Sequence, residues 1–497
     1  MGRALAQSAR AMRHLSPDAV HDVRVALRRC RTLGDTLREL DPHPAWREMD
    51  ATARRLFRRL GPLRDADVRR AWLEALTPAE DPFRRRIAAR LEEENDAHRR
   101  RAAKALRQFD SAEWRSLRQT LIRRARRLSA GSPVFTLLAL ERWTDARALH
   151  RPALRGGPGP LHRLRIGLKR FRYTVENFLP ARHMAWGRDL KRIQDLLGEA
   201  HDLDELRAEL AALEKEQAKS PGGLPDAAVA PSWLARLDAE REKRVREYRT
   251  LATGEESLWQ VWRAGLPAGA AAERAAFARL EAWAGFRGAD RKFARHVARL
   301  AVSLFRAFCR TGSGAPAKKD FSLRVLRAAA LLHRVGRAGG KKGHHKAAYR
   351  MILGLPPPLG WTSEEMKLTA LVARYHRGKL PRPHHLGFAE LDEAQRAQVS
   401  SLAGVLRLAE ALARESPPRH ARARVEMSGD VLVVWLAGYR ETPTGAARIA
   451  RRKILLEGLM ARPIVIRCQD AQPHSPVPAA SSASAEEKPA LPERPAT

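Results

Sequence analysis

The sequence predicts an all-α protein in which one helical domain is internally duplicated and a second helical domain follows. Long stretches rich in Ala, Leu, Arg and Glu place apolar residues at helical spacing, and Pro or Gly clusters divide them into segments of helix length. Runs of β-branched residues are confined to two short segments, near residues 430 and 465, so only a few short strands are expected.

The composition is strongly basic. The 497 residues carry 93 Lys plus Arg against 56 Asp plus Glu, a net charge of +37, and most of the cations are arginines. Arginine stays charged and binds phosphate or carboxylate oxygens in a bidentate way, so the expected partner is a polyanion.

The three cysteines form no CxxC pair, and no apolar run approaches the roughly 18 residues that cross a bilayer. We therefore expect a cytoplasmic protein without membrane contact.

The Pro and Gly breaks order the first part of the chain. Helices are expected up to about residue 150, and again from the cluster at 156–160 to about residue 250. Residues 251–288 are richer in Gly and Ala and are expected to be a boundary segment.

A third helical block is expected at 289–468. Its end holds a predicted hairpin, in which residues 425–427 pair with 431–435 around a Ser-Gly-Asp turn, and a strand at 463–467. The Pro, Ala and Ser bias of residues 469–497 predicts a disordered tail.

A duplicated basic pattern distinguishes two of the predicted helices. Residues 20–31 and 161–172 both contain a histidine, an arginine three positions later, a basic residue at seven and an arginine at ten. At about 100° per residue these positions fall within an arc of about 80°, so each helix carries its cations on one stripe beside its apolar face. The stripes are His21, Arg24, Arg28 and Arg31 in the first copy, and His162, Arg165, Lys169 and Arg172 in the second.

A second repeated segment follows each stripe. Residues 56–67 and 193–204 share a glycine, an arginine or histidine three residues later, and two aspartates. In each copy the basic residue is expected to face the stripe, and the aspartate after it is expected to orient the cations by hydrogen bonding. These residues are Arg64 and Asp65 in the first copy, and His201 and Asp202 in the second.

Arginines at helical spacing usually mark a solvated face balanced by glutamates, as we predict for residues 84–107. In the two repeated segments acids are missing from the stripe and the pattern occurs twice, which favours binding over solvation. Two interpretations of His21 and His162 stay open: they contact a ligand, or they are structural histidines that cap a buried hydrogen bond.

These motifs resemble the CHAD family, the conserved-histidine α-helical domain, over roughly residues 10–250. The resemblance implies two four-helix halves, about 10–145 and 158–250, around a basic channel that binds inorganic polyphosphate. Such a polymer carries about one charge per phosphoryl unit and no bases, so converging arginines suit it. The resemblance implies that polyphosphate is bound by the residues of the two stripes together with Arg64 and His201. Lys191 and Arg55 are additional candidates.

Residues 289–468 resemble HD-type domains, and more narrowly the carboxyl-terminal helical domain of exopolyphosphatase and guanosine pentaphosphatase proteins. This resemblance depends on the order of five features along the chain: His296, His333, residues 345–349, residues 374–377 and the short closing strands.

The block departs from HD hydrolases at the residues that bind metal. Those enzymes hold divalent ions with a His-Asp doublet and a later Asp, but here the doublet is His333-Arg334 and Glu410 replaces the last Asp. A guanidinium repels cations, so we expect no metal and no cofactor. If a metal did bind, it would use His296, His333 and Glu410; otherwise both histidines are buried structural residues. The remaining basic groups suit a second anion site: Arg334, Lys341, Lys342, His345, Arg374, His376 and Arg377.

The leading hypothesis is a polyphosphate-binding protein whose HD-like domain is a second anion-binding or partner-docking module. No actin-like catalytic fold, P-loop or nucleophile elbow is found, so no catalytic residue is predicted. The alternative is an HD-type metal-dependent phosphohydrolase that acts on polyphosphate or a phosphorylated nucleotide. Expected partners are polyphosphate, with a separate phosphatase or proteins of polyphosphate granules, whereas nucleic acid is bound only non-specifically.

Overall fold

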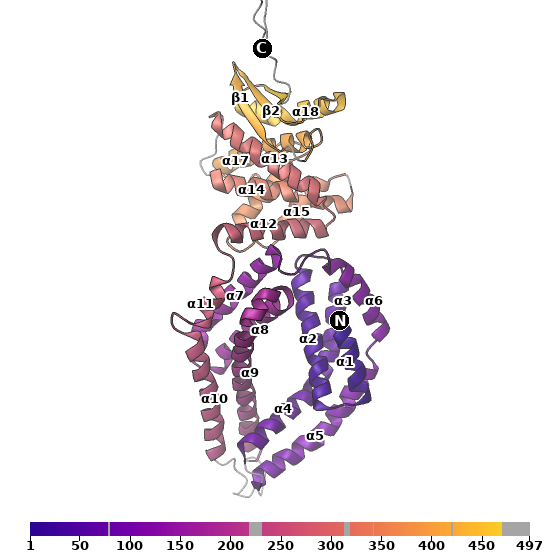
Figure 1. Ribbon diagram of the computed structural model, residues 1–497, viewed down its shortest axis with the longest axis vertical. Helices are drawn as coiled ribbons and strands as arrows, with labels where there is room; N and C mark the ends of the chain where they lie inside the picture. Colours follow the sequence, from indigo (N-terminus) through magenta and orange to yellow (C-terminus); the bar gives the residue numbers. More distant parts are fainter. Residues whose placement is uncertain (78–79, 218–230, 313–318, 341, 419–420, 470–497) are drawn as a thin grey trace, which may run out of the picture. The chain divides into compact units, whose positions relative to one another are not determined.

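The computed structural model describes residues 1–77, 80–217, 231–312, 319–340, 342–418 and 421–469. Within these residues helices dominate, and strands occur only near the carboxyl-terminal end (Figure 1). The chain forms two compact units. Unit 1 comprises Met1–Arg295 and Ala328–Lys379, and unit 2 comprises His296–Arg327 and the described part of Leu380–Thr497. The all-α fold predicted from the sequence is thus confirmed.

Within unit 1, the first half of the duplicated bundle contains α1 (Gly2–Arg13), α2 (Pro17–Arg38), α3 (Ala45–Arg59), α4 (Gly61–Leu76), α5 (Pro82–Arg107) and α6 (Ser111–Ala125). The second contains α7 (Pro133–Ala153), α8 (Pro158–Phe178), α9 (Pro180–Gln217), α10 (Pro231–Ala252) and α11 (Leu258–Ala264). Several helices begin at a proline, which tolerates the first turn because its missing N–H needs no partner there. Ser16 caps α2 by accepting a hydrogen bond from the Ala19 amide.

The two halves repeat one packing order. In the first half α1 packs on α2, α2 on α3, and α4 on α5; in the second α7 packs on α8, α8 on α9, and α9 on α10. One difference separates the copies: the chain breaks between α3 and α4 at Leu60, whereas α9 is continuous through Gly198. The first copy has proline after its glycine, at Pro62, and the second has Glu199, which continues a helix.

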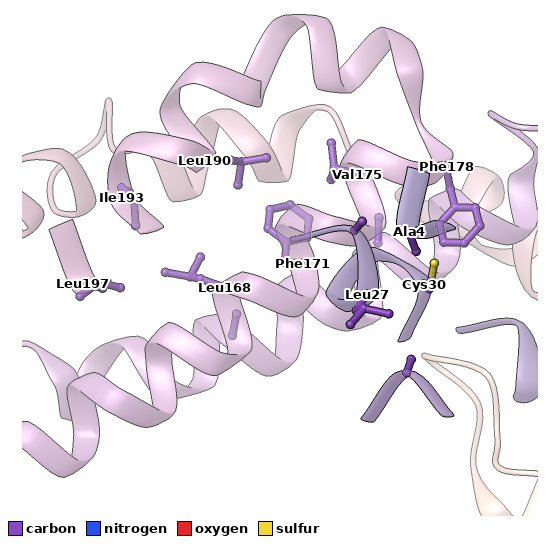
Figure 2. Packing of buried hydrophobic residues seen from close by; sticks show 14 of the residues in the cluster. Ala4, Leu27, Cys30, Leu168, Phe171, Val175, Phe178, Leu190, Ile193 and Leu197 are labelled. Carbon is purple, nitrogen blue, oxygen red and sulfur yellow. The ribbon is translucent and has the colours of Figure 1, made fainter. Parts of the chain in front are cut away.

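The core of unit 1 joins both halves. Leu27 and Cys30 from α2, Leu168 and Phe171 from α8, and Ile193 from α9 belong to one buried cluster (Figure 2). Leu27, Phe171 and Ile193 are fully buried, so their apolar area is removed from water and holds the two stripe helices in place.

The expected boundary segment, residues 251–288, holds α11 and α12 (Gly269–Phe286). Trp259 and Trp262 of α11 are buried in the core of unit 1, and α12 packs on α7. The bundle that carries the stripes therefore uses residues beyond 250.

The remaining elements follow α12. They are α13 (Arg291–Arg310), α14 (Lys319–Leu332), η2 (Val335–Gly339), α15 (His344–Leu353), α16 (Ser363–Tyr375), α17 (Glu393–Leu412), β1 (Ala423–Ser428), β2 (Val431–Leu436), α18 (Pro443–Met460) and β3 (Ile464–Cys468). The expected tail lies outside the described residues except for residue 469, and so does Lys341. None of the described helices is long and apolar enough to cross a membrane.

The three strands of unit 2 form one sheet in the order β1-β2-β3. β1 and β2 are antiparallel, with Val425 opposite Val434, and β2 and β3 are parallel, with Val434 opposite Ile466. Alternate residues of β2 are buried, as expected when one face of a sheet covers a core. The predicted hairpin and third strand are both confirmed.

Candidate anion-binding site

The two basic stripes lie on helices that pack against each other. α2 contacts α8, and Arg28 Nη1 donates a hydrogen bond to Tyr173 Oη at 3.3 Å. Arg29 of α2 also forms an ion pair with Glu176 of α8. The duplication therefore places its two sets of cations at one interface.

Phe57 of α3 supports the first stripe. The guanidinium carbons of Arg24, Arg28 and Arg31 lie 4.4, 5.5 and 5.5 Å from the centroid of its ring. Arg24 Nη1 also donates a hydrogen bond to the Phe57 carbonyl oxygen at 3.4 Å. The negative face of an aromatic ring attracts cations, so Phe57 helps to hold three arginines together against their mutual repulsion.

The repeated glycines make room for the equivalent arginines Arg24 and Arg165. A Cβ atom on Gly61 would lie 3.0 Å from Arg24 Nη1, and one on Gly198 would lie 3.8 Å from Arg165 Nε. The glycine of the second repeated segment thus lies beside the arginine of the stripe in both copies, most tightly in the first. The two glycines can be found in the sequence, but this contact depends on the packing of α2 on α4 and of α8 on α9.

Lys169 of α8 is surrounded by arginines from both stripes. The charges that act most strongly on its half-buried amine belong to Arg28, Arg165, Arg24 and Arg172. Burial, and then these four cations, lower the pKa of Lys169 to about 7. We call these five residues the central cation cluster.

A second pair of basic residues repeats beside the cluster. The rings of His162 and His201 lie 4.4 Å apart between centroids, and in the other copy Arg64 is the strongest charge that acts on His21. Burial is the main cause that lowers the pKa of both His21 and His201. His201 Nε2 also lies 3.2 Å from Glu205 Oε1.

The two repeated aspartates lie close to the cations. Asp65 Oδ1 is 3.8 Å from Arg24 Nη2, an ion pair that is longer than a hydrogen bond. Burial, with repulsion from Glu205 and Asp65, raises the pKa of Asp202 to about 6, and Arg165 opposes this shift. The strongest cation that acts on Asp202 is Arg165 of the second stripe, and Asp65 pairs with Arg24 of the first; Arg64 also acts on Asp202.

The last arginine of each stripe faces an acid. Arg31 Nε lies 3.1 Å from Asp50 Oδ1, and Arg172 Nε lies 3.9 Å from Glu176 Oε2. Asp50 lies on α3, so the spacing along α2 gave no sign of it.

The two additional residues expected to bind, Lys191 and Arg55, are both exposed. Lys191 pairs with Asp195 on its own helix, and Arg55 donates a hydrogen bond to Thr52 Oγ1 at 3.2 Å. Neither is among the four charges that act most strongly on Lys169.

Part of the expected second anion site gathers on α15 and α16. Burial lowers the pKa of His345, and so do the charges of His344, Lys346, Arg374 and Arg377. The guanidinium of Arg374 lies 5.2 Å from the ring centroid of Tyr349, which orients it. We call His345, Lys346, Arg374 and Arg377 the α15–α16 basic surface.

Two other residues expected in that site lie elsewhere. His376 is 1% exposed, its Nδ1 bonds the Ala373 carbonyl oxygen at 2.6 Å, and its ring packs on His333 and His344. The guanidinium of Arg334 lies 4.6 Å from the ring centroid of Phe293. His376 thus belongs to a buried histidine cluster, whose desolvation lowers its pKa well below the ordinary value.

The candidate metal ligands have other contacts. His296 Nε2 bonds the Ser416 carbonyl oxygen at 3.1 Å, His333 Nδ1 bonds the Ala330 carbonyl oxygen at 2.7 Å, and Glu410 pairs with Arg414 at 2.6 Å. Among the residues that the structure describes, no group of three or more His, Cys, Asp or Glu side chains is arranged to hold a metal ion.

Comparison with protein families matches residues 2–211 to one family, and this range contains both stripes and both repeated aspartates. This part of the chain is a CHAD domain. Residues 286–435 match the Ppx/GppA phosphatase family, domain III, which confirms the second resemblance. No curated protein matches the chain. The CHAD match ends before Trp259 and Trp262, although both belong to the core that holds the stripe helices.

Proposed function

We propose that the protein binds inorganic polyphosphate, and that one polymer chain contacts both halves of the CHAD domain at the central cation cluster. The observation that carries this proposal is the placement of Arg24 and Arg28 of α2, with Arg165 and Arg172 of α8, around Lys169. Cations that the fold forces together repel one another, and a polyanion relieves that repulsion.

The chemistry of the cluster favours a polymer of phosphates. Arginine forms two parallel hydrogen bonds with phosphate oxygens, and neighbouring arginines match successive phosphoryl groups. Single-stranded nucleic acid would also need aromatic faces on which its bases stack. Two aromatic rings lie beside the cluster, Phe57 and Tyr173, and both already have arginine guanidinium carbons 4.4–5.8 Å from their centroids.

The Ppx/GppA domain III adds a second contact in this proposal. The α15–α16 basic surface carries His345, Lys346, Arg374 and Arg377 in reach of one another. Arg377 and Lys346 are exposed, so a polyanion reaches them from solvent. We expect this surface to strengthen the binding of long chains and to leave the binding of short chains unchanged.

A charge-matched comparison tests the central cluster. One variant carries Arg24→Gln, Arg28→Gln, Arg165→Gln and Arg172→Gln, and the control carries Arg100→Gln, Arg101→Gln, Arg107→Gln and Arg118→Gln at exposed positions. Both lose the same net charge. Hydrogen bonds to charged groups contribute about 1.5–3 kcal/mol each, so we expect the first variant to lose on the order of 100-fold or more in polyphosphate affinity.

The control variant should keep its affinity within about threefold, because it changes only long-range attraction. Titration calorimetry measures both affinities, and circular dichroism verifies that both variants are folded. Equal losses in the two folded variants would show that general charge, not the cluster, binds the polymer. RNA added as a competitor should displace polyphosphate poorly from the unsubstituted protein.

A further inference from the structure

A groove of about 500 Å³ lies between α3 and the junction of α5 with α6, within unit 1. Its apolar lining comprises buried Leu56 and Ala105 and half-buried Phe109. Sites for small ligands commonly have volumes of about 300–1,000 Å³ and mostly apolar walls. The groove is therefore large enough to hold one small organic molecule. We call it the α3–α6 groove.

The α3–α6 groove and the central cation cluster lie on opposite faces of α3. Arg55 and Arg59 are four residues apart, so they share one face of the helix, and both line the groove. Phe57 is two residues from each of them, and its side chain points about 160–200° away around the helix. The ring of Phe57 contacts the arginines of the first stripe. Polyphosphate at the central cation cluster would thus leave this groove open.

Opposite charges line the groove without pairing across it. The basic lining residues are Arg55, Arg58 and Arg59, and the acidic ones are Asp110 and Glu113. In the described part of the chain, none of these five side chains forms an ion pair, although both signs of charge line the same groove. Arg55 donates a hydrogen bond to Thr52 Oγ1, and Asp110 Oδ1 accepts from the first amides of α6. A ligand that accepts hydrogen bonds at one end and donates them at the other would contact both walls.

A second groove, on α9, has similar residue types but different pairing. Its two acidic lining residues are Asp195 and Glu199, and each has a basic partner in the protein. Asp195 pairs with Lys191, and Glu199 pairs with Arg244 at 3.0 Å. The charges of that groove are satisfied by the protein itself. Those of the α3–α6 groove are available to a ligand.

We propose that the α3–α6 groove binds a nucleoside monophosphate. The phosphate accepts hydrogen bonds from Arg55 and Arg59, and the base packs on the ring of Phe109. The sugar hydroxyls donate hydrogen bonds to the carboxylates of Asp110 and Glu113. These acids also disfavour polyphosphate in the groove, because every unit of that polymer is negative. The site is separate from the one in the proposed function and does not rest on it.

The first test is titration calorimetry of the full chain with AMP, GMP, CMP and UMP. Inorganic phosphate and the four nucleosides are titrated as controls, because each lacks one part of the ligand. We expect at least one nucleotide to bind about tenfold or more tightly than its nucleoside and than inorganic phosphate. The inference is overturned if none of the four nucleotides binds, or if inorganic phosphate binds as tightly as the best of them.

Charge-matched variants locate the bound nucleotide. Arg55→Gln with Arg59→Gln should lower the affinity for the best nucleotide by about tenfold or more. Arg100→Gln with Arg101→Gln removes the same charge at exposed positions and should keep that affinity within about threefold. Circular dichroism verifies that both variants are folded. An unchanged affinity in the first variant would place the nucleotide elsewhere and overturn the inference.

Glu113→Gln separates recognition from general charge. The substitution removes a negative charge from the groove, so the affinity for inorganic phosphate should rise. The affinity for the nucleotide should instead fall by about threefold, because the sugar loses a charged acceptor. A rise in both affinities would show attraction by charge alone, and it would contradict the inference.

The failure of this inference is distinguishable from that of the proposed function. Arg24→Gln with Arg28→Gln, in the central cation cluster, should weaken polyphosphate and leave the nucleotide unchanged. If polyphosphate binds and no nucleotide does, only the inference is wrong. If a nucleotide binds in the groove and polyphosphate does not bind, only the proposed function is wrong.

Discussion

Arg28 Nη1 donates a hydrogen bond to Tyr173 Oη at 3.3 Å, and this contact joins two helices that are copies of one sequence pattern. Arg28 is the third member of the first stripe, and Tyr173 directly follows the last member of the second stripe, Arg172. Tyr173 is 6% exposed, and the bond is partly buried between α2 and α8. It fixes one arginine of the first copy against the second copy.

The first prediction concerns this bond. Tyr173→Phe removes the acceptor and keeps the ring, so we expect the free energy of unfolding to fall by about 1 kcal/mol. Arg28 also loses its fixed orientation, and polyphosphate affinity should fall by about threefold. Urea denaturation and titration calorimetry measure the two effects. An unchanged affinity in the folded variant would show that the orientation of Arg28 does not matter.

The two repeated glycines allow a matched comparison. In Gly61→Ala the new Cβ would lie 3.0 Å from Arg24 Nη1, so Arg24 must shift and affinity should fall. In Gly198→Ala the closest atom of Arg165 lies 3.8 Å away, an ordinary contact, and the residue is inside α9. Alanine there should raise the free energy of unfolding by about 0.5–1 kcal/mol and keep affinity unchanged. Equal effects of the two substitutions on affinity would contradict the packing described here.

The lowered pKa of Lys169 predicts that the protein takes up a proton when it binds polyphosphate. Its pKa is about 7 in the free protein, and a bound polyanion stabilises the ammonium and raises that pKa. At about pH 8 the amine is mostly neutral before binding and charged after it, so binding takes up a proton, and affinity falls as pH rises above 7. Calorimetry in buffers of different ionisation enthalpy counts these protons. Lys169→Arg is the control, because its charge is permanent, and uptake as large in that variant would refute the assignment.

The raised pKa of Asp202 predicts that replacing this residue increases the free energy of unfolding in a pH-dependent way. Its pKa of about 6 lies above the ordinary 3.8, so the ionised carboxylate destabilises the fold above pH 6, and the effect disappears below about pH 4. Asp202→Asn should therefore raise the free energy of unfolding at pH 8 by on the order of 1 kcal/mol, after allowance for solvent screening. At pH 4 the variant and the unsubstituted protein should be equal.

The control is Asp96→Asn, at an exposed position of α5, which should change stability little at either pH. Denaturation curves at pH 4 and pH 8 measure the free energy of unfolding of both variants and of the unsubstituted protein. A loss of stability in Asp202→Asn at pH 8 would mean that attraction to Arg165 outweighs the burial of the carboxylate.

Much of this architecture was predictable because it depends on local spacing. Pro17, Gly61 and Pro158 begin helices, and the two stripes lie where the His-to-Arg spacing places them. The hairpin was predictable for the same reason, since alternation and a turn signal are both local.

The other features of the candidate site depend on contacts between segments that are distant in the sequence. The ring of Phe57 contacts arginines that precede it by 26 to 33 residues. Asp50, which lies on another helix, pairs with Arg31. His376 follows Tyr375 beside two exposed or half-buried cations, yet its side chain points into a buried histidine cluster. No spacing rule separates such neighbours, because burial is decided by the packing of whole helices.

The most direct test of the account is a titration with a short polyphosphate chain of defined length, chosen to fit one site. Three proteins are compared: the unsubstituted chain, a first-copy variant with Arg24→Gln and Arg28→Gln, and a second-copy variant with Arg165→Gln and Arg172→Gln. If both halves hold one chain, the stoichiometry is one chain per protein, and each variant loses affinity at that single site by on the order of tenfold or more. Two chains per protein, with one site lost and the other unchanged in each variant, would contradict a shared site.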